Sequence, residues 1–170
     1  TTAGLALGTT SEEYSDEVAA GVVLSQAVAP DTSIPHDTAV DLVVSKGREP
    51  IEVPDLAGST AEEAKAAIEA LGLVAAPTQA YSDSVAAGSV LSQATAAGET
   101  LHRGDSVSYV VSLGPEMVEV PSVQGKQESQ AIAALEAAGL KVEVERILGG
   151  VFGTARSTDP GAGESVKKGS

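Results

Sequence analysis

The 170-residue sequence is short of several residue types, and each shortage excludes a class of protein. It contains no Cys, so disulfide bonds and thiolate metal sites are impossible. With one Phe, three Tyr and no Trp, any core must be filled by Ala, Val, Leu and Ile. No apolar run reaches the roughly 18 to 20 residues that a membrane-spanning helix needs, and nothing resembles a signal sequence. If the parent protein is membrane-anchored, we expect the anchor to lie outside this sequence.

Basic residues are also few. Ten Lys and Arg stand against 24 Asp and Glu, which gives a net charge of -14. A chain this acidic repels phosphate backbones and anionic lipid headgroups, so we expect neither nucleic acid nor a membrane surface as a partner. Six of the ten basic residues fall after residue 114, where the net charge is only -2. This part of the chain is the best candidate for contacts with an anionic ligand.

The sequence repeats itself at a period of 67 residues. Residues 14–47 align with residues 81–114 without a gap, and 18 of the 34 positions are identical. The same offset relates Val53-Pro54 to Val120-Pro121. A fixed period of this size indicates tandem copies of one small domain rather than one large domain. A unit of about 67 residues has a small core and only modest stability by itself.

Three repeats follow from this period, and two of them are incomplete. The first, residues 1–47, has the strands that follow the helix, including one at 40–45, but no helix. The second, residues 51–114, is complete. The third, residues 119–170, lacks the last strand.

Local patterns in the complete repeat predict one helix. Ser59 and Glu62 have the spacing of a capping box, which predicts a helix over residues 60–71. Small and apolar residues then recur on one face at spacings of three and four. Gly72 stands where a left-handed C-terminal stop belongs.

A short extended segment precedes this helix, because Pro54 disfavours a helical conformation at Val53. Three further runs have strand patterns and are separated by glycine turns: residues 73–80, 90–93 and 107–112. The unit is therefore assigned to the α+β class, with one helix packed on a small, mainly antiparallel, three-stranded sheet.

The third repeat predicts a similar but less clearly started helix. Its apolar stripe runs from Ala131 to Ala138 and ends at Gly139, whereas Lys126 and Ser129 occupy the aligned capping positions. A strand is expected after it, over residues 140–147.

Several linked motifs together resemble the PASTA domain. They are Val-Pro-Asp-Leu-x-Gly, a helix closing on Gly-Leu, a Ser-Asp-x-Val-x-x-Gly turn and a terminal Val-Val-Ser-x-Gly. PASTA domains are extracellular modules of bacterial penicillin-binding proteins and of membrane-anchored serine/threonine kinases. The resemblance implies a sensor at the extracellular face of the cell membrane, in the cell wall space, that binds peptidoglycan fragments or beta-lactam-like ligands and promotes kinase dimerisation. The number of units favours a kinase parent, and a penicillin-binding protein or a non-binding spacer are the alternatives.

The sequence offers no catalytic constellation. His36 and His102 lie in turns without the neighbours of a metal site, and solvated turn residues are the better interpretation. Ser165 and Lys168 match the Ser-x-x-Lys string of penicillin-binding enzymes, but the partner motifs are absent. We therefore expect no enzymatic activity, no cofactor and no metal in this chain.

Candidate ligand contacts are chosen by chemistry. Peptidoglycan stems present carboxylates and sugars, which exposed cations and aromatic faces bind. The alternative is that the aromatic residues close small cores and the cations are merely solvated. The candidates are Arg146, Phe152, Arg156, Lys167 and Lys168 in the third repeat, and Tyr81 and Arg103 in the second.

The connections between repeats are short. Seven residues separate Ser45 from Val53, and seven separate Ser112 from Val120. Such linkers cannot act as flexible tethers, so an elongated rod is expected. The incomplete end repeats also suggest weak self-association, in which the third repeat of one chain accepts strand 40–45 of another. The alternative is that the parent chain continues at both ends.

Overall fold

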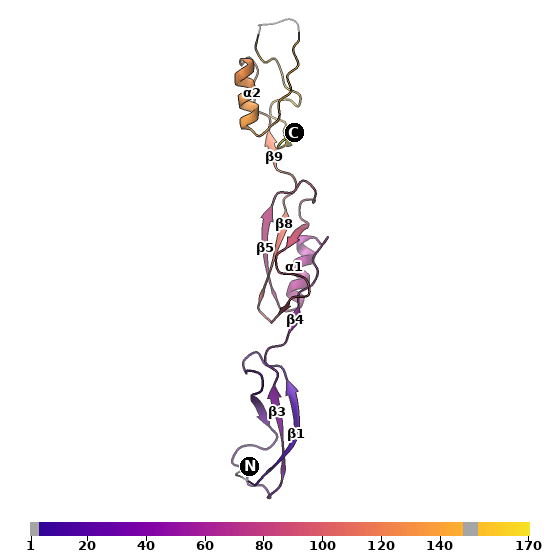
Figure 1. The fold of residues 1–170 in the computed structure, drawn as a ribbon, viewed down its shortest axis with the longest axis vertical. Coiled ribbons are helices and arrows are strands. Elements are labelled where there is room, and N and C mark those ends of the chain that lie inside the picture. Colours follow the sequence, from indigo (N-terminus) through magenta and orange to yellow (C-terminus); the bar gives the residue numbers. More distant parts are fainter. Residues whose placement is uncertain (1–3, 148–152) are drawn as a thin grey trace. The chain divides into compact units, whose positions relative to one another are not determined.

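The computed structural model describes residues 4–147 and 153–170, and Figure 1 shows the chain as a ribbon. Contacts divide the chain into two compact units. One unit comprises Thr1–Pro77 with Ser92–Tyr109, and the other comprises Thr78–Leu91 with Val110–Ser170. The boundary between the units passes through the second repeat.

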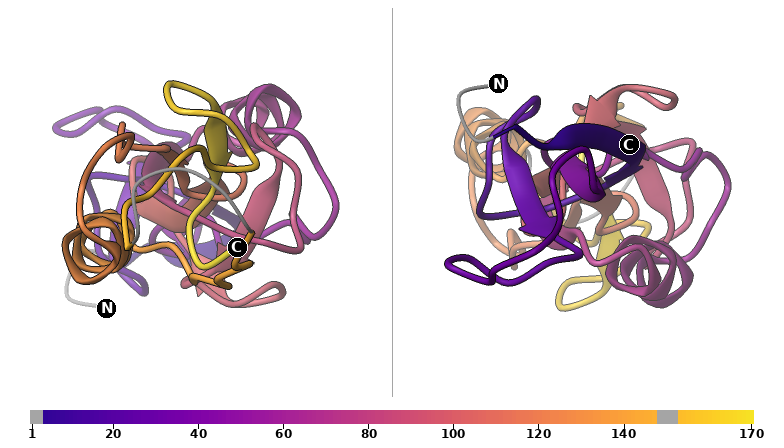
Figure 2. Two further views of the ribbon diagram at one scale, coloured as in Figure 1. Left: turned by 90° about the horizontal axis from the view of Figure 1, so that it is seen from above. Right: turned by 90° about the horizontal axis from the view of Figure 1, so that it is seen from below.

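The first repeat is a three-stranded sheet. It contains β1 (Ala6–Glu13), β2 (Val23–Gln26) and β3 (Ala39–Ser45) in the order β1-β3-β2. Strands β1 and β3 run parallel, whereas β2 and β3 run antiparallel, and the right view of Figure 2 shows these indigo and purple strands roughly end-on. The chain turns back through β2 before β3 enters the centre, so the sheet is mixed and the expectation of a mainly antiparallel sheet is only partly met. Within residues 4–47 the structure has no helix.

Because β3 is central, both of its edges are paired. Donating residues 40–45 to another chain would break both ladders. This arrangement disfavours strand exchange as a route to self-association.

The second repeat follows the order that its sequence predicts. Short strands β4 (Ile51–Glu52) and β7 (Thr100–Leu101) pair antiparallel. Helix α1 spans Ala61–Ala70, inside the range predicted for it. The remaining strands form a sheet in the order β5-β8-β6, with β5 at Val74–Ala80, β6 at Val90–Gln93 and β8 at Ser106–Ser112.

The start of α1 differs by one residue from the prediction. The N-cap is Thr60, whose hydroxyl accepts a hydrogen bond from the Glu63 N–H, while the Glu63 carboxylate accepts one from the Thr60 N–H at 2.9 Å. Both Ser59 and Thr60 have a glutamate three residues later, so the sequence pattern alone does not separate them. The Ser59 N–H instead closes a turn onto the Leu56 carbonyl. The hydrogen bond from the Thr60 N–H lowers the pKa of Glu63.

Starting the helix at residue 61 directs its small and branched residues inward. Ala64 and Ile68 are fully buried, as are Val107 and Tyr109 of β8. Each large apolar side chain buried in this way contributes about 1.5–3 kcal/mol. In the first repeat the residues aligned with this face of β8 are only half-buried, since no helix covers them in residues 4–47.

A buried serine ends the central strand in both of the first two repeats. The Ser112 hydroxyl donates to the Val85 carbonyl at 2.7 Å and accepts from the Gly114 N–H at 2.9 Å. Ser45 makes the same two contacts, with the Val18 carbonyl and the Gly47 N–H. This pair of hydrogen bonds explains why Val-Val-Ser-x-Gly recurs together with the Ser-Asp-x-Val turn.

The third repeat contains an antiparallel pair of short strands, β9 (Met117–Glu119) and β10 (Ser165–Lys167), and helix α2 (Glu128–Ala137). The N-cap of α2 is Gln127, which makes no side-chain capping hydrogen bond, so the less clearly started helix is confirmed.

The strand expected over residues 140–147 is not formed, and that prediction is wrong. In the second repeat the equivalent strand β5 lies beside β8, whereas residues 140–147 have no strand beside them among the described residues. The Lys141 N–H does reach the Ser170 carbonyl at 2.7 Å, at the point where such pairing would begin. A strand pattern alone does not form a strand, because a strand needs a neighbour to pair with.

Candidate functional site

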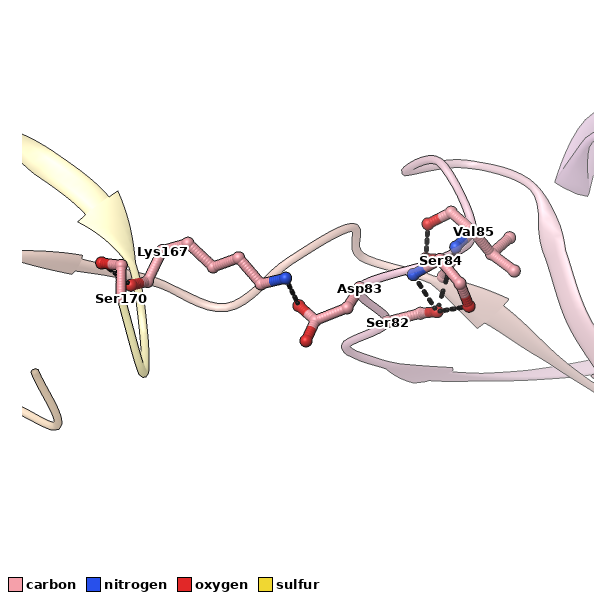
Figure 3. Close-up of polar contacts among 7 residues, drawn as sticks. Ser82, Asp83, Ser84, Val85, Lys167 and Ser170 are labelled. Carbon is pink, nitrogen blue, oxygen red and sulfur yellow. Dashed lines mark hydrogen bonds and ion pairs between the residues drawn. The ribbon is translucent and has the colours of Figure 1, made fainter. Parts of the chain in front are cut away.

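Lys167 forms an ion pair with the second repeat. Its ammonium nitrogen lies 2.9 Å from the Asp83 carboxylate, as Figure 3 shows. Asp83 occupies the tip of a turn in which the Ser82 hydroxyl accepts hydrogen bonds from the N–H groups of Ser84 and Val85. The turn therefore presents an exposed carboxylate to Lys167, and this cation is already partnered.

Two further candidate cations also have acidic partners. Arg146 donates to Glu128 at 2.7 Å, at the start of α2, and Lys168 donates to Glu116 at 2.9 Å. All four side chains are more than a third exposed. Exposed pairs of this kind contribute little stability, about 0–1 kcal/mol, but they reduce the charge available to an anionic ligand.

Arg103 lies against the C-terminus of α1. A Cβ atom placed on Gly72 would be 2.9 Å from its guanidinium, and its carbonyl accepts a hydrogen bond from Arg48 at 2.6 Å. Gly72 adopts a φ of +74°, which glycine tolerates at a helix end. A cation in this position also interacts favourably with the helix dipole.

A basic residue recurs at this position in all three repeats, which the sequence analysis did not identify. His36 lies against Gly4, and Lys168 lies against Gly139 at the end of α2, as Arg103 does against Gly72. The signal in the sequence was a basic residue directly before Asp37, Gly104 and Gly169, which all have positive φ. The recurrence supports a structural role for Arg103 and Lys168.

The histidines are each close to an aspartate. His36 lies 2.9 Å from Asp37, and His102 lies 3.6 Å from Asp105. The hydrogen bond from the His102 N–H lowers the pKa of Asp105, and Arg48 at 3.6 Å adds to the effect. No group of three or more metal-binding side chains occurs within the described residues.

The two remaining described candidates, Tyr81 and Arg156, are exposed and lie in different repeats. Tyr81 is 58% exposed, and the aligned Tyr14 lies 5.3 Å beneath the Lys46 ammonium. Arg156 forms no ion pair within residues 4–147 and 153–170. Phe152 lies outside the described residues. The six described candidates therefore do not converge on one cluster.

Arg156 does line a depression of about 240 Å³ in the third repeat. It is the one charged residue in the lining. Two segments form the walls: Ser122, Val123 and Gln124 on one side, and Arg156, Ser157, Thr158, Gly161 and Ala162 on the other. The arrangement combines one cation with small polar residues and backbone, which suits a small polar ligand rather than an apolar one.

The PASTA domain family model matches residues 1–46, 51–112 and 118–170. A probable serine/threonine-protein kinase of Bifidobacterium longum, pknA2, is 42% identical over 151 residues, which cover 88% of this chain and 20% of that protein. The serine/threonine-protein kinase PrkC of Bacillus subtilis is 37% identical over 118 residues, which cover 69% of this chain and 18% of that protein. The chain thus spans about a fifth of the length of these relatives.

Two solved structures from Staphylococcus aureus are similar to this chain. One is the entire extracellular region of the Ser/Thr kinase PrkC, with a TM-score of 0.79 at 27% identity, covering 99% of this chain and 61% of that one. The other is the three-PASTA-domain of a Ser/Thr kinase, with a TM-score of 0.68 at 28% identity and coverage of 99% and 86%. No helix in the described part of this chain is long and apolar enough to cross a membrane.

Proposed function

Because this chain belongs to the PASTA domain family along nearly all of its length, we propose that it is the extracellular sensor region of a bacterial membrane-anchored serine/threonine-protein kinase. The observation that carries the proposal is the similarity to serine/threonine kinases over 88% of the chain, together with the likeness to the extracellular region of PrkC. The matched segments are PASTA domains alone, so this chain is a regulatory region and not the catalytic part.

The ligands of this region are peptidoglycan fragments with a peptide stem. Such stems end in carboxylates, and the least acidic repeat of this chain is the third, which holds six of its ten basic residues. Binding by extracellular segments of two molecules would bring their cytoplasmic kinase domains together. Dimerisation on ligand binding is thus the proposed signal.

Within this proposal the repeats form an extended arrangement. The supporting observation is the seven-residue spacing at both connections, which is too short for free tumbling. A compact sphere of this length has a radius of gyration of about 15–16 Å. Small-angle scattering of a dilute solution should give a clearly larger value, and a value near that of the sphere would refute the extended arrangement.

The second candidate is a spacer that binds nothing specific. It is favoured by the acidic partners of Arg146, Lys167 and Lys168, since these cations are already paired. Titration with a defined muropeptide, followed by backbone amide NMR, separates the two functions. Localised shifts in the third repeat support the sensor, whereas an absence of shifts at millimolar ligand supports the spacer.

A further inference from the structure

In the second repeat, two side chains accept hydrogen bonds from the N–H groups of a bend in the backbone. The Leu56 N–H donates to the amide oxygen of Gln93 at 3.1 Å, and the amide nitrogen of Gln93 donates to the Pro54 carbonyl at 2.9 Å. The next N–H, that of Ala57, donates to the Asp55 carboxylate at 3.0 Å. Two consecutive N–H groups thus receive oxygen acceptors from the protein itself.

The third repeat keeps the backbone of this bend. The Gly98 N–H donates to the Val53 carbonyl at 2.9 Å, and the Gly163 N–H donates to the Val120 carbonyl at 2.8 Å. This hydrogen bond aligns the two loops residue by residue. Thr158 then stands at the position of Gln93.

The acceptors, however, are missing in the third repeat. Thr158 is too short to reproduce the two contacts of Gln93, and Ser122 replaces Asp55. The N–H groups of Val123 and Gln124 accordingly have no acceptor among the residues that the structure describes. Val123 is buried and Gln124 is exposed. Each N–H is a strong donor, so the two groups can donate to the oxygens of a bound ligand.

The depression of about 240 Å³ lies at this position, and Val123, Gln124 and Thr158 all line it. Arg156 lines it too, where the second repeat has the aligned Leu91. One hollow is therefore lined by two residues whose N–H groups lack an acceptor, and by a guanidinium without an ion pair, among the residues that the structure describes. A carboxylate has two oxygens and one negative charge, which match this set of donors.

We propose that this depression in the third repeat is a carboxylate-binding site. The ligand carboxylate takes the place of the Gln93 and Asp55 oxygens, accepting from Val123 and Gln124 and pairing with Arg156. This deepens the proposed function and depends on it for the source of the carboxylate, the peptide stem of a cell-wall fragment.

Charges around the depression limit the choice of anion. Asp159 is next to Thr158 in the chain, and the Glu164 carboxylate lies beside Gly161, another lining residue. One cation with two carboxylates in the surrounding loop disfavours a doubly charged anion such as phosphate. The site is therefore expected to select a single carboxylate at a peptide end.

Calorimetric titration of the whole chain tests the site with a simple probe. N-acetyl-alanyl-alanine with a free carboxylate should bind, and its neutral methyl amide should bind at least tenfold more weakly. Inorganic phosphate should also bind more weakly than the free acid. Equal heats for the acid and the amide would overturn the proposal.

Variants locate the binding. Arg156→Leu, which installs the residue of the second repeat, should weaken binding of the acid about 10-fold to 100-fold. Thr158→Gln should abolish it by supplying the acceptor internally, and dispersed amide NMR resonances from the third repeat itself will show that the variant is folded. The matched control is Lys141→Ala, which removes another exposed cation of the same repeat and should change affinity less than threefold. Equal losses in Arg156→Leu and Lys141→Ala would indicate diffuse charge attraction and refute the site.

The reciprocal change tests the same chemistry in the second repeat. Gln93→Thr should free the Leu56 N–H and produce a new, weaker response to the acid there, and no response at that N–H would contradict the acceptor argument. Different results would refute the sensor function and the carboxylate-binding site. Muropeptide shifts that map away from Val123 and Gln124 would overturn this site while leaving the sensor function intact.

Discussion

At the scale of single residues, hydroxyl groups at two strand ends hold each small domain together. Ser45 and Ser112 are 2% and 1% exposed, and each links a carbonyl and an N–H that the sheet leaves unpaired. Since these domains have few aromatic residues and small cores, two buried hydrogen bonds make up a larger share of the free energy of unfolding than in a larger domain.

Replacing this hydroxyl tests its contribution. Ser112→Ala should destabilise the chain by about 1–3 kcal/mol, because the Val85 carbonyl and the Gly114 N–H lose their shared partner. The control is Ser106→Ala, an exposed serine of the same strand, which should change the free energy of unfolding by less than about 0.5 kcal/mol. Urea denaturation measures both. Similar values for the two variants would show that the buried hydroxyl contributes nothing special.

At the scale of elements, the start of α1 is set by a capping box at Thr60 and Glu63, one residue after the position predicted from the sequence. Thr60→Ala should cost about 1 kcal/mol, because the Glu63 N–H loses its acceptor. Ser59→Ala should cost almost nothing, since its side chain does not cap the helix. Thermal unfolding of the two variants decides between the positions, and a larger loss from Ser59→Ala would contradict the observed cap.

The same cap makes stability depend on pH. The pKa of Glu63 is lower in the folded chain than its ordinary value of 4.5, so the unfolded chain takes up the proton first. Its contribution to stability is therefore present above pH 4.5 and is lost as the pH falls through the lower folded value. Glu63→Gln should reduce the difference in unfolding free energy between pH 7 and pH 3. An unchanged pH dependence in this variant would show that other carboxylates account for it.

Elements whose pattern and partners both lie in the chain could be predicted from the sequence. Helix α1 and strands β5, β6 and β8 fall within a residue of their expected ranges, because apolar periodicity and glycine turns bound each of them. Residues 140–147 have a strand pattern but no adjacent strand to pair with, and the pattern alone could not reveal this.

The candidate site shows a different limit of sequence reasoning. Arg156 could be chosen by its charge, but the role of Thr158 depends on what Gln93 does in the second repeat. That hydrogen bond joins residues 37 positions apart, and only the folded structure brings them together. The ion pairs of Arg146, Lys167 and Lys168 likewise depend on tertiary neighbours that composition does not identify.

At the scale of the whole molecule, repeats of one fold carry different polar groups. In the second repeat, Gln93 and Asp55 accept hydrogen bonds from the N–H groups of the bend. In the third repeat, the residues with the equivalent N–H groups line a depression together with Arg156. The net charge of -14 repels anions in general, so selective recognition requires a local set of donors such as this one. Ligand recognition is therefore expected to be concentrated in one repeat.

The most direct test compares the two bends within one sample. Amide NMR of the intact chain, titrated with a muropeptide that has a free stem carboxylate, follows the N–H groups of Val123 and Gln124 beside those of Leu56 and Ala57. Recognition by the third repeat predicts saturable downfield shifts at Val123 and Gln124 and none at Leu56 and Ala57, which already have acceptors. Equal shifts at both bends, or shifts at neither, would contradict recognition by the third repeat.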